Sequence, residues 1–147
     1  GKVAIPDAIL NKNGRLTGEE FAIMKTHTRK GAELLSSIPQ MRSHAAFRYA
    51  YDIALHHHER WDGRGYPDGL VGDETPVWTQ AVALADVYDA LVSKRCYKEA
   101  YSFDTALAMI LEGQCGAFNP RLLAAFQAVE PSLRNLYGKG KEENPNG

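Results

Sequence analysis

Residues 56–67 have the sequence His-His-His-Glu-Arg-Trp-Asp-Gly-Arg-Gly-Tyr-Pro, in which three histidines precede a glycine-rich segment. Before them, from about Met41 to His58, apolar side chains recur at helical spacing. After them, glycine and proline recur as far as Trp78, so residues 59–78 cannot remain helical for long. A loop of this length in a compact helical domain is usually either functional or disordered. Its large apolar side chains favour a folded loop.

The rest of the chain has helical periodicity nearly throughout, and no segment alternates as a strand does. Thr17 and Glu20 have the spacing of a capping box, which predicts that a helix begins at Gly18. The segment from about Thr79 to Ser93 is apolar nearly all round, which predicts the central buried helix. The predicted helices span approximately residues 18–37, 41–58, 79–93, 102–113 and 119–130, the last ending before Pro131.

The composition is that of one globular domain. The chain has 147 residues, of which 44% are hydrophobic and 24% charged, enough to form a buried core. Residues 138–147 contain no apolar side chain. We therefore predict an all-α domain over residues 1–137, followed by a disordered tail over 138–147.

Charge and cysteine content exclude several classes of protein. Seventeen basic and eighteen acidic residues leave a formal net charge of -1, which argues against a partner such as a nucleic acid polymer. No apolar run is long enough to cross a bilayer, and the two cysteines cannot form a disulfide framework. We therefore expect a cytoplasmic protein.

The histidine run has two interpretations. Neutral imidazole is a common ligand of transition metals, whereas protonated histidine also stabilises the C-terminal end of a helix. His27 lies three residues after Met24 and four before Gly31, so it faces inward with them as a ligand or as an ordinary core residue.

Asp86 adds a carboxylate to this set. It lies between Val82 and Ala90 on its face of the apolar helix, where a buried carboxylate needs either an arginine or a metal ion beside it. His27, two of the three histidines 56–58 and Asp86 together form a plausible ligand set for iron, manganese or zinc.

Beyond these residues, a series of motifs resembles the HD-GYP family of the HD phosphohydrolase superfamily. The matching blocks occur in family order over roughly residues 1–130: 5–10, 25–28, 57–67, 85–91, 93–98 and 118–120. The resemblance implies an HD-domain-like helical bundle of bacterial origin that hydrolyses cyclic di-GMP at a site with divalent metal ions, usually iron or manganese. It also implies metal ligands at His27, His57, His58 and Asp86, a catalytic Lys2 beside the scissile phosphate, and substrate contacts from Tyr66, Arg95 and Lys98.

The resemblance also implies parts that would precede Gly1. The His-Asp dyad that names the superfamily should stand just before Gly1, and further N-terminal helices should precede the dyad. We therefore expect weak or no hydrolysis by this chain alone, and exposed apolar surface that favours a homodimer.

Two alternatives to the phosphodiesterase remain at the level of sequence. One is a binding module for cyclic di-GMP or for a protein, in which the Gly65-Tyr66-Pro67 loop docks a partner such as a diguanylate cyclase domain. The other is a different nucleotide phosphohydrolase of the HD superfamily.

Overall fold

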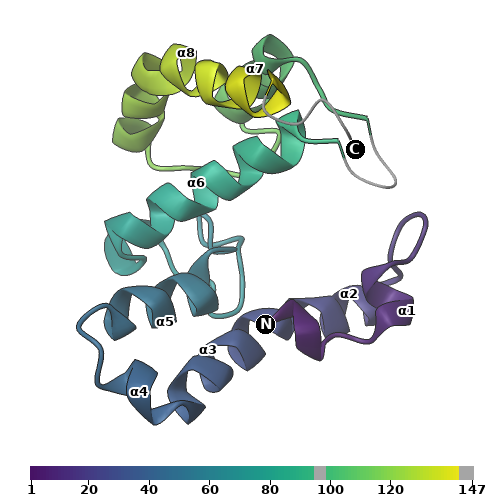
Figure 1. The fold of residues 1–147 in the computed structure, drawn as a ribbon, viewed down its shortest axis with the longest axis vertical. Helices are drawn as coiled ribbons and strands as arrows, with labels where there is room; N and C mark the ends of the chain where they lie inside the picture. The colour runs from purple at the N-terminus through teal and green to yellow at the C-terminus, as the bar shows by residue number, and fades with distance from the viewer. Residues whose placement is uncertain (95–98, 143–147) are drawn as a thin grey trace.

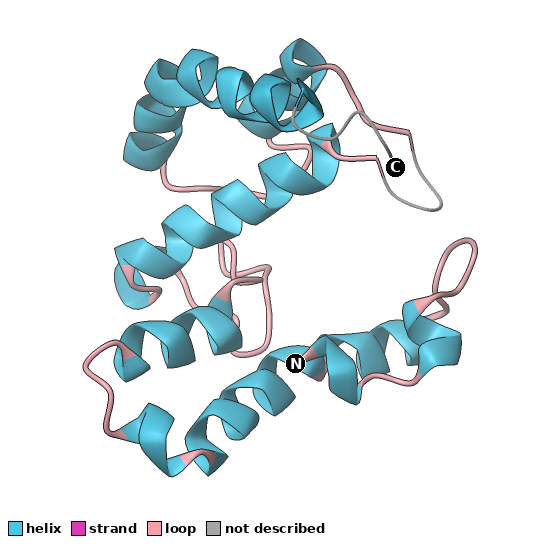
Figure 2. Cartoon of the chain, viewed as in Figure 1, coloured by secondary structure: helices cyan, strands magenta, loops and turns pink. Residues whose placement is uncertain are grey.

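The computed structural model describes residues 1–94 and 99–142, and these residues form helices joined by loops, with no β-strand among them (Figure 2). The all-α fold class is confirmed. In Figure 1, helix α6 (Val77–Val92) crosses the middle of the molecule, with the N-terminal helices on one side and α7 (Phe103–Leu111) and α8 (Pro120–Glu142) on the other. The N-terminal elements are η1 (Lys2–Ala4), α1 (Asp7–Leu10), α2 (Gly18–Lys25), α3 (His27–Ser37), α4 (Pro39–Arg42) and α5 (Phe47–His56).

The predicted helix 18–37 is two helices that break at Thr26. The capping box at its start is confirmed, because Thr17 Oγ1 accepts from the Glu20 amide and the Glu20 carboxylate accepts from the Thr17 amide. At the break, the side chains of residues 26–28 bind the carbonyls of residues 23–25, one each. Side chains that compete for backbone carbonyls in this way bend or end a helix.

The predicted helix 41–58 is also interrupted. Helix α4 ends at Arg42, a turn follows, and α5 begins only at Phe47. Helices α3 and α5 then pack against each other, which brings the first residue of α3 close to the last turn of α5. This pairing positions the histidines.

Helix α6 is central, but the prediction that it is buried all round is wrong. Its Ala83, Leu84, Tyr88 and Leu91 join a core with residues of α7 and α8. Its opposite face is exposed, and Val82 retains 37% of its accessible surface. The other core members are Ala106, Ile110, Phe118 and Phe126.

Helix α8 continues through Pro131, so the prediction that it ends before this residue is wrong. Tertiary contacts beyond the proline hold the helix: Leu133 and Tyr137 pack against the core, and the Tyr137 hydroxyl donates to Asp89 Oδ1 at 3.0 Å. Residues 138–142, in the segment predicted to be disordered, belong to this helix, and residues 143–147 lie outside the described part of the chain.

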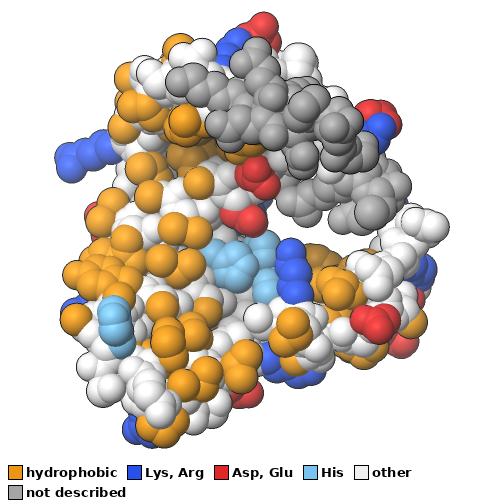
Figure 3. Space-filling view, in the orientation of Figure 1, with side chains coloured by type: hydrophobic (Ala, Val, Ile, Leu, Met, Phe, Trp, Pro, Cys, Tyr) orange, Lys and Arg blue, Asp and Glu red, His pale blue; other side chains and the backbone are white. Residues whose placement is uncertain are grey.

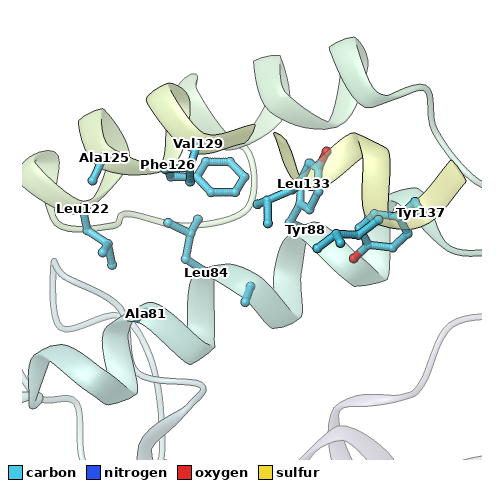
Figure 4. Close-up of a pocket in the computed structure, with 11 residues that line it drawn as sticks. Ala81, Leu84, Tyr88, Leu122, Ala125, Phe126, Val129, Leu133 and Tyr137 are labelled. Carbon is cyan, nitrogen blue, oxygen red and sulfur yellow. The ribbon is translucent and has the colours of Figure 1, made fainter. Parts of the chain in front are cut away.

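An apolar groove of about 530 Å³ lies between α6 and α8 (Figure 4). Leu84 and Tyr88 line one side of it, and Phe126, Leu133 and Tyr137 line the other. Leu136 also lines the groove and retains 66% of its accessible surface. Within the described residues, every helix is too short or too polar to span a membrane.

Candidate metal centre

His27 and His57 are held by the same kind of backbone hydrogen bond. His27 begins α3, is 5% exposed, and its Nδ1 lies 2.8 Å from the Met24 carbonyl in the break between α2 and α3. His57 follows the end of α5, and its Nδ1 lies 2.8 Å from the Ile53 carbonyl. Because a carbonyl only accepts, each Nδ1 carries the proton and each Nε2 carries a lone pair.

These two lone pairs point at each other. The Nε2 atoms of His27 and His57 are 3.3 Å apart, and His58 contributes a third nitrogen, with the three ligand atoms within 4.8 Å of one another. Convergent lone pairs with outward N–H groups bonded to carbonyls are typical of metal-binding histidines. The residues present therefore fit a divalent metal ion.

Burial favours the neutral, ligating form of His27 and His58. The pKa of His58 is lowered to about 3, chiefly by burial and then by the neighbouring His57 and His27. Burial also lowers the pKa of His27, against the opposing effect of its bond to the Met24 carbonyl. Figure 3 shows histidine side chains at the surface of a hollow, with acidic side chains on one side of them and basic ones on the other.

Asp86 lies on the exposed face of α6, so the prediction that its carboxylate is buried is wrong. The Asp86 carboxylate is also outside the group of three histidine nitrogens. Its charge nevertheless acts on Tyr66, whose pKa is raised to about 12, first by burial and then by Asp86, while Arg60 opposes the rise. Its role as a ligand stays a prediction.

Lys2 lies near the histidines because Gly1, the residue before it, packs against α3. A Cβ on Gly1 would lie 1.9 Å from the His27 carbonyl oxygen, and a Cβ on Gly31 would lie 3.3 Å from the Gly1 Cα atom. Only glycine permits this approach. The exposed Lys2 then contributes to the lowered pKa of both His27 and His58. Its catalytic role stays a prediction.

Tyr66 extends the site into the glycine-rich loop. Its ring stacks on His58 with 4.7 Å between centroids and 27° between planes, and its amide donates to the His58 carbonyl at 3.2 Å. The structure thus brings Tyr66 to the histidines. The other two predicted substrate contacts, Arg95 and Lys98, lie outside the described residues.

The geometry agrees with a comparison with known families. Residues 1–122 match the family model described as HD domain. The chain belongs to the HD domain family. This family binds divalent metal ions, consistent with the three histidines.

Curated relatives support the predicted resemblance of this HD domain to HD-GYP proteins. A cyclic di-GMP phosphodiesterase of Vibrio cholerae is 50% identical over 131 residues, which are 88% of this chain and 27% of the relative. A cyclic di-GMP phosphodiesterase response regulator of Xanthomonas campestris is 45% identical over 139 residues, covering 95% and 36%. A 3'3'-cGAMP-specific phosphodiesterase of Vibrio cholerae is 41% identical over 123 residues, covering 84% and 23%. The chain therefore spans between 23% and 36% of the length of these relatives.

The prediction of a folded loop in the HD domain is confirmed, and Glu59 is the residue that organises it. Its side chain is 3% exposed and accepts three backbone amides, those of Asp68 and Gly69 on Oε1 and that of Leu70 on Oε2, at 2.7 to 3.1 Å. Sequence reasoning missed this role. The available signal was a carboxylate placed directly before a glycine-rich turn, whose amides cannot all bond within the turn.

His56 is the member of the histidine run that does not join the centre. Its Nε2 lies 3.0 Å from Asp68 Oδ2, and Arg29 of α3 also donates to Asp68. Both contacts lower the pKa of Asp68, the His56 bond more strongly. The potential ligand atoms of His56, Glu59 and Asp68 also lie close together. However, Glu59 already accepts backbone amides, and Asp68 accepts from the Arg29 guanidinium. The contacts of Asp68 with His56 and Arg29 therefore hold the loop against α5 and α3.

Proposed function

We propose that this HD domain is the catalytic part of a metal-dependent phosphodiesterase that hydrolyses cyclic di-GMP. The observation that carries the proposal is the convergence of the His27 and His57 Nε2 atoms beside His58. The names of the relatives support the substrate, because two of them are cyclic di-GMP phosphodiesterases.

His27, His57 and His58 hold a divalent ion, with Asp86 as a further ligand and iron or manganese as the expected metal. An ion bound there supplies positive charge that lowers the pKa of water and offsets charge on a phosphodiester. The bonds to the Met24 and Ile53 carbonyls fix the tautomer of two rings, so their Nε2 atoms need no proton loss before they bind.

Other side chains bind and orient the phosphodiester. The Lys2 ammonium group, close enough to affect the pKa of His27 and His58, offsets negative charge on a phosphate oxygen. Tyr66 is protonated at neutral pH, like any tyrosine, and its pKa raised to about 12 disfavours proton loss further, so its hydroxyl serves as a donor and not as a base. The resemblance adds Arg95 and Lys98 as substrate contacts.

The name of one relative supports a second substrate of the same class for this chain. The 41% identical Vibrio cholerae protein is named for 3'3'-cGAMP, which differs from cyclic di-GMP in one base. The predicted partners also remain proposals: docking of diguanylate cyclase domains by the Gly65-Tyr66-Pro67 loop, and a homodimer.

Turnover and metal content test the proposal together. The chain, and a longer version that includes the His-Asp dyad expected before Gly1, are loaded with iron or manganese and given cyclic di-GMP or 3'3'-cGAMP. We expect the longer version to hydrolyse cyclic di-GMP and H57A in it to be inactive. If the metal-loaded longer version leaves both dinucleotides intact, the function is wrong. If it hydrolyses only 3'3'-cGAMP, the substrate is wrong.

A further inference from the structure

An exposed aromatic ring lies next to the metal centre and takes no part in the function described above. Phe21 on α2 retains 46% of its accessible surface. Its ring meets that of Tyr66 edge to face, with centroids 6.2 Å apart and planes at 85°. Because Tyr66 in turn stacks on His58, the three rings form a continuous aromatic series from the metal centre to the surface.

A cation accompanies the two outer rings. Lys25, one turn after Phe21 on α2, places its Nζ 5.4 Å from the centroid of Phe21 and 5.9 Å from that of Tyr66. Within the described residues Lys25 forms no salt bridge, so its charge faces aromatic rings and solvent. An ammonium group over aromatic rings is weakly stabilised and stays available to an anion.

A partly exposed aromatic ring beside an available cation is a combination that binds nucleotides. Bases stack on aromatic side chains, and positive charge binds the phosphate. We propose that Phe21 is the stacking platform for one guanine base of the cyclic dinucleotide, and that Lys25 supplies positive charge to the adjoining phosphate. This inference rests on the proposed function, because the substrate class comes from it.

Binding measurements on the intact chain test the platform. The dissociation constant for cyclic di-GMP is measured by calorimetry with manganese present, and chromatography afterwards verifies that the ligand is intact. F21A should weaken binding about tenfold, F21L nearly as much, and F21W about twofold or less, because only the ring stacks. The matched control is I23A, since Ile23 is an apolar residue of the same helix with 41% exposure.

Fluorescence separates a stacking role from a structural one. The indole of F21W should be quenched by cyclic di-GMP, whereas that of I23W should not. K25M should weaken binding and also reduce the dependence of affinity on salt, because one phosphate contact is lost.

The two proposals fail differently. If the wild-type chain binds cyclic di-GMP but F21A binds it as tightly, the platform is overturned and the proposed function stands. If F21W is not quenched on binding, the platform is likewise overturned. If the manganese-loaded wild-type chain does not bind cyclic di-GMP, the platform is overturned, whereas the proposed function is decided by turnover in the longer version.

Discussion

The Nε2 atoms of His27 and His57 lie 3.3 Å apart, although the Nδ1 of each ring is already bonded to a backbone carbonyl. Two facing lone pairs repel unless a proton or a metal ion lies between them. Burial lowers the pKa of His27, which disfavours the proton. The arrangement of the two Nε2 atoms therefore favours a bound metal ion.

Replacing either histidine should weaken metal binding. We expect H27A and H57A each to weaken manganese binding at least tenfold, because each deletes a ligand whose orientation the backbone has fixed. Isothermal titration measures the affinity. H44A is the matched control, since His44 is exposed on the turn between α4 and α5. Equal affinity in H27A and the wild type would contradict the assignment.

Stability of the metal-free chain should fall below pH 6.5. The pKa of His58 is near 6.5 when unfolded and about 3 when folded, so between these values the unfolded state binds the extra proton. The free energy of unfolding then decreases as pH falls, by at most about 1.4 kcal/mol per pH unit for this group, and by less because the ring is half-buried. Urea denaturation in EDTA from pH 6.5 to 5 measures the slope, and H58N should reduce it.

Sequence periodicity predicted which segments are helical better than it predicted where they end. The break at Thr26 was hidden because residues on both sides keep helical spacing, and only the side chains of residues 26–28 reveal it by binding carbonyls. The continuation of α8 was equally hidden. Pro131 is a strong local signal, but the packing of Leu133 and Tyr137 outweighs it.

For the site, the sequence identified the candidate residues, and the fold determines how close together they lie. His27 and His57 are thirty positions apart, and only the packing of α3 on α5 brings them together. The sequence of three consecutive histidines does not reveal that His56 contacts Asp68 while His57 and His58 belong to the metal centre. Asp86 was placed on a buried face because periodicity cannot tell which side of an apolar helix is left open.

Removing the carboxylate of Glu59 should unfold the loop before the helices. E59A leaves three backbone amides without their acceptor, and we expect a loss of about 3 kcal/mol in the free energy of unfolding. E59Q keeps one oxygen and should lose about half as much. Hydrogen exchange should show the amides of residues 68–70 losing protection in E59A. The control is E74Q, because the exposed carboxylate of Glu74 accepts only one amide in the wild type, that of Val71. Equal losses in E59A and E74Q would contradict the role of Glu59.

The stability of α8 beyond Pro131 should depend on one buried carboxylate, that of Glu130. Glu130 is fully buried, accepts the Tyr88 hydroxyl at 2.6 Å, and receives Arg134 Nε on both oxygens at 2.8 and 2.9 Å. R134M leaves this buried charge without its cation and should lower the free energy of unfolding more than Y88F does. Y88F removes one neutral donor while Arg134 remains, and should cost about 1 kcal/mol.

The exposed Arg121, at the start of the same helix, gives the matched control R121M, which should change stability by less than about 0.5 kcal/mol. Urea denaturation at pH 7 ranks the three variants. Because Arg134 follows Pro131 in the helix, R134M should also lower the total helical content measured by circular dichroism. If R134M is no less stable than Y88F, Glu130 does not need the cation, and the core contacts of Leu133 and Tyr137 alone carry α8 past Pro131.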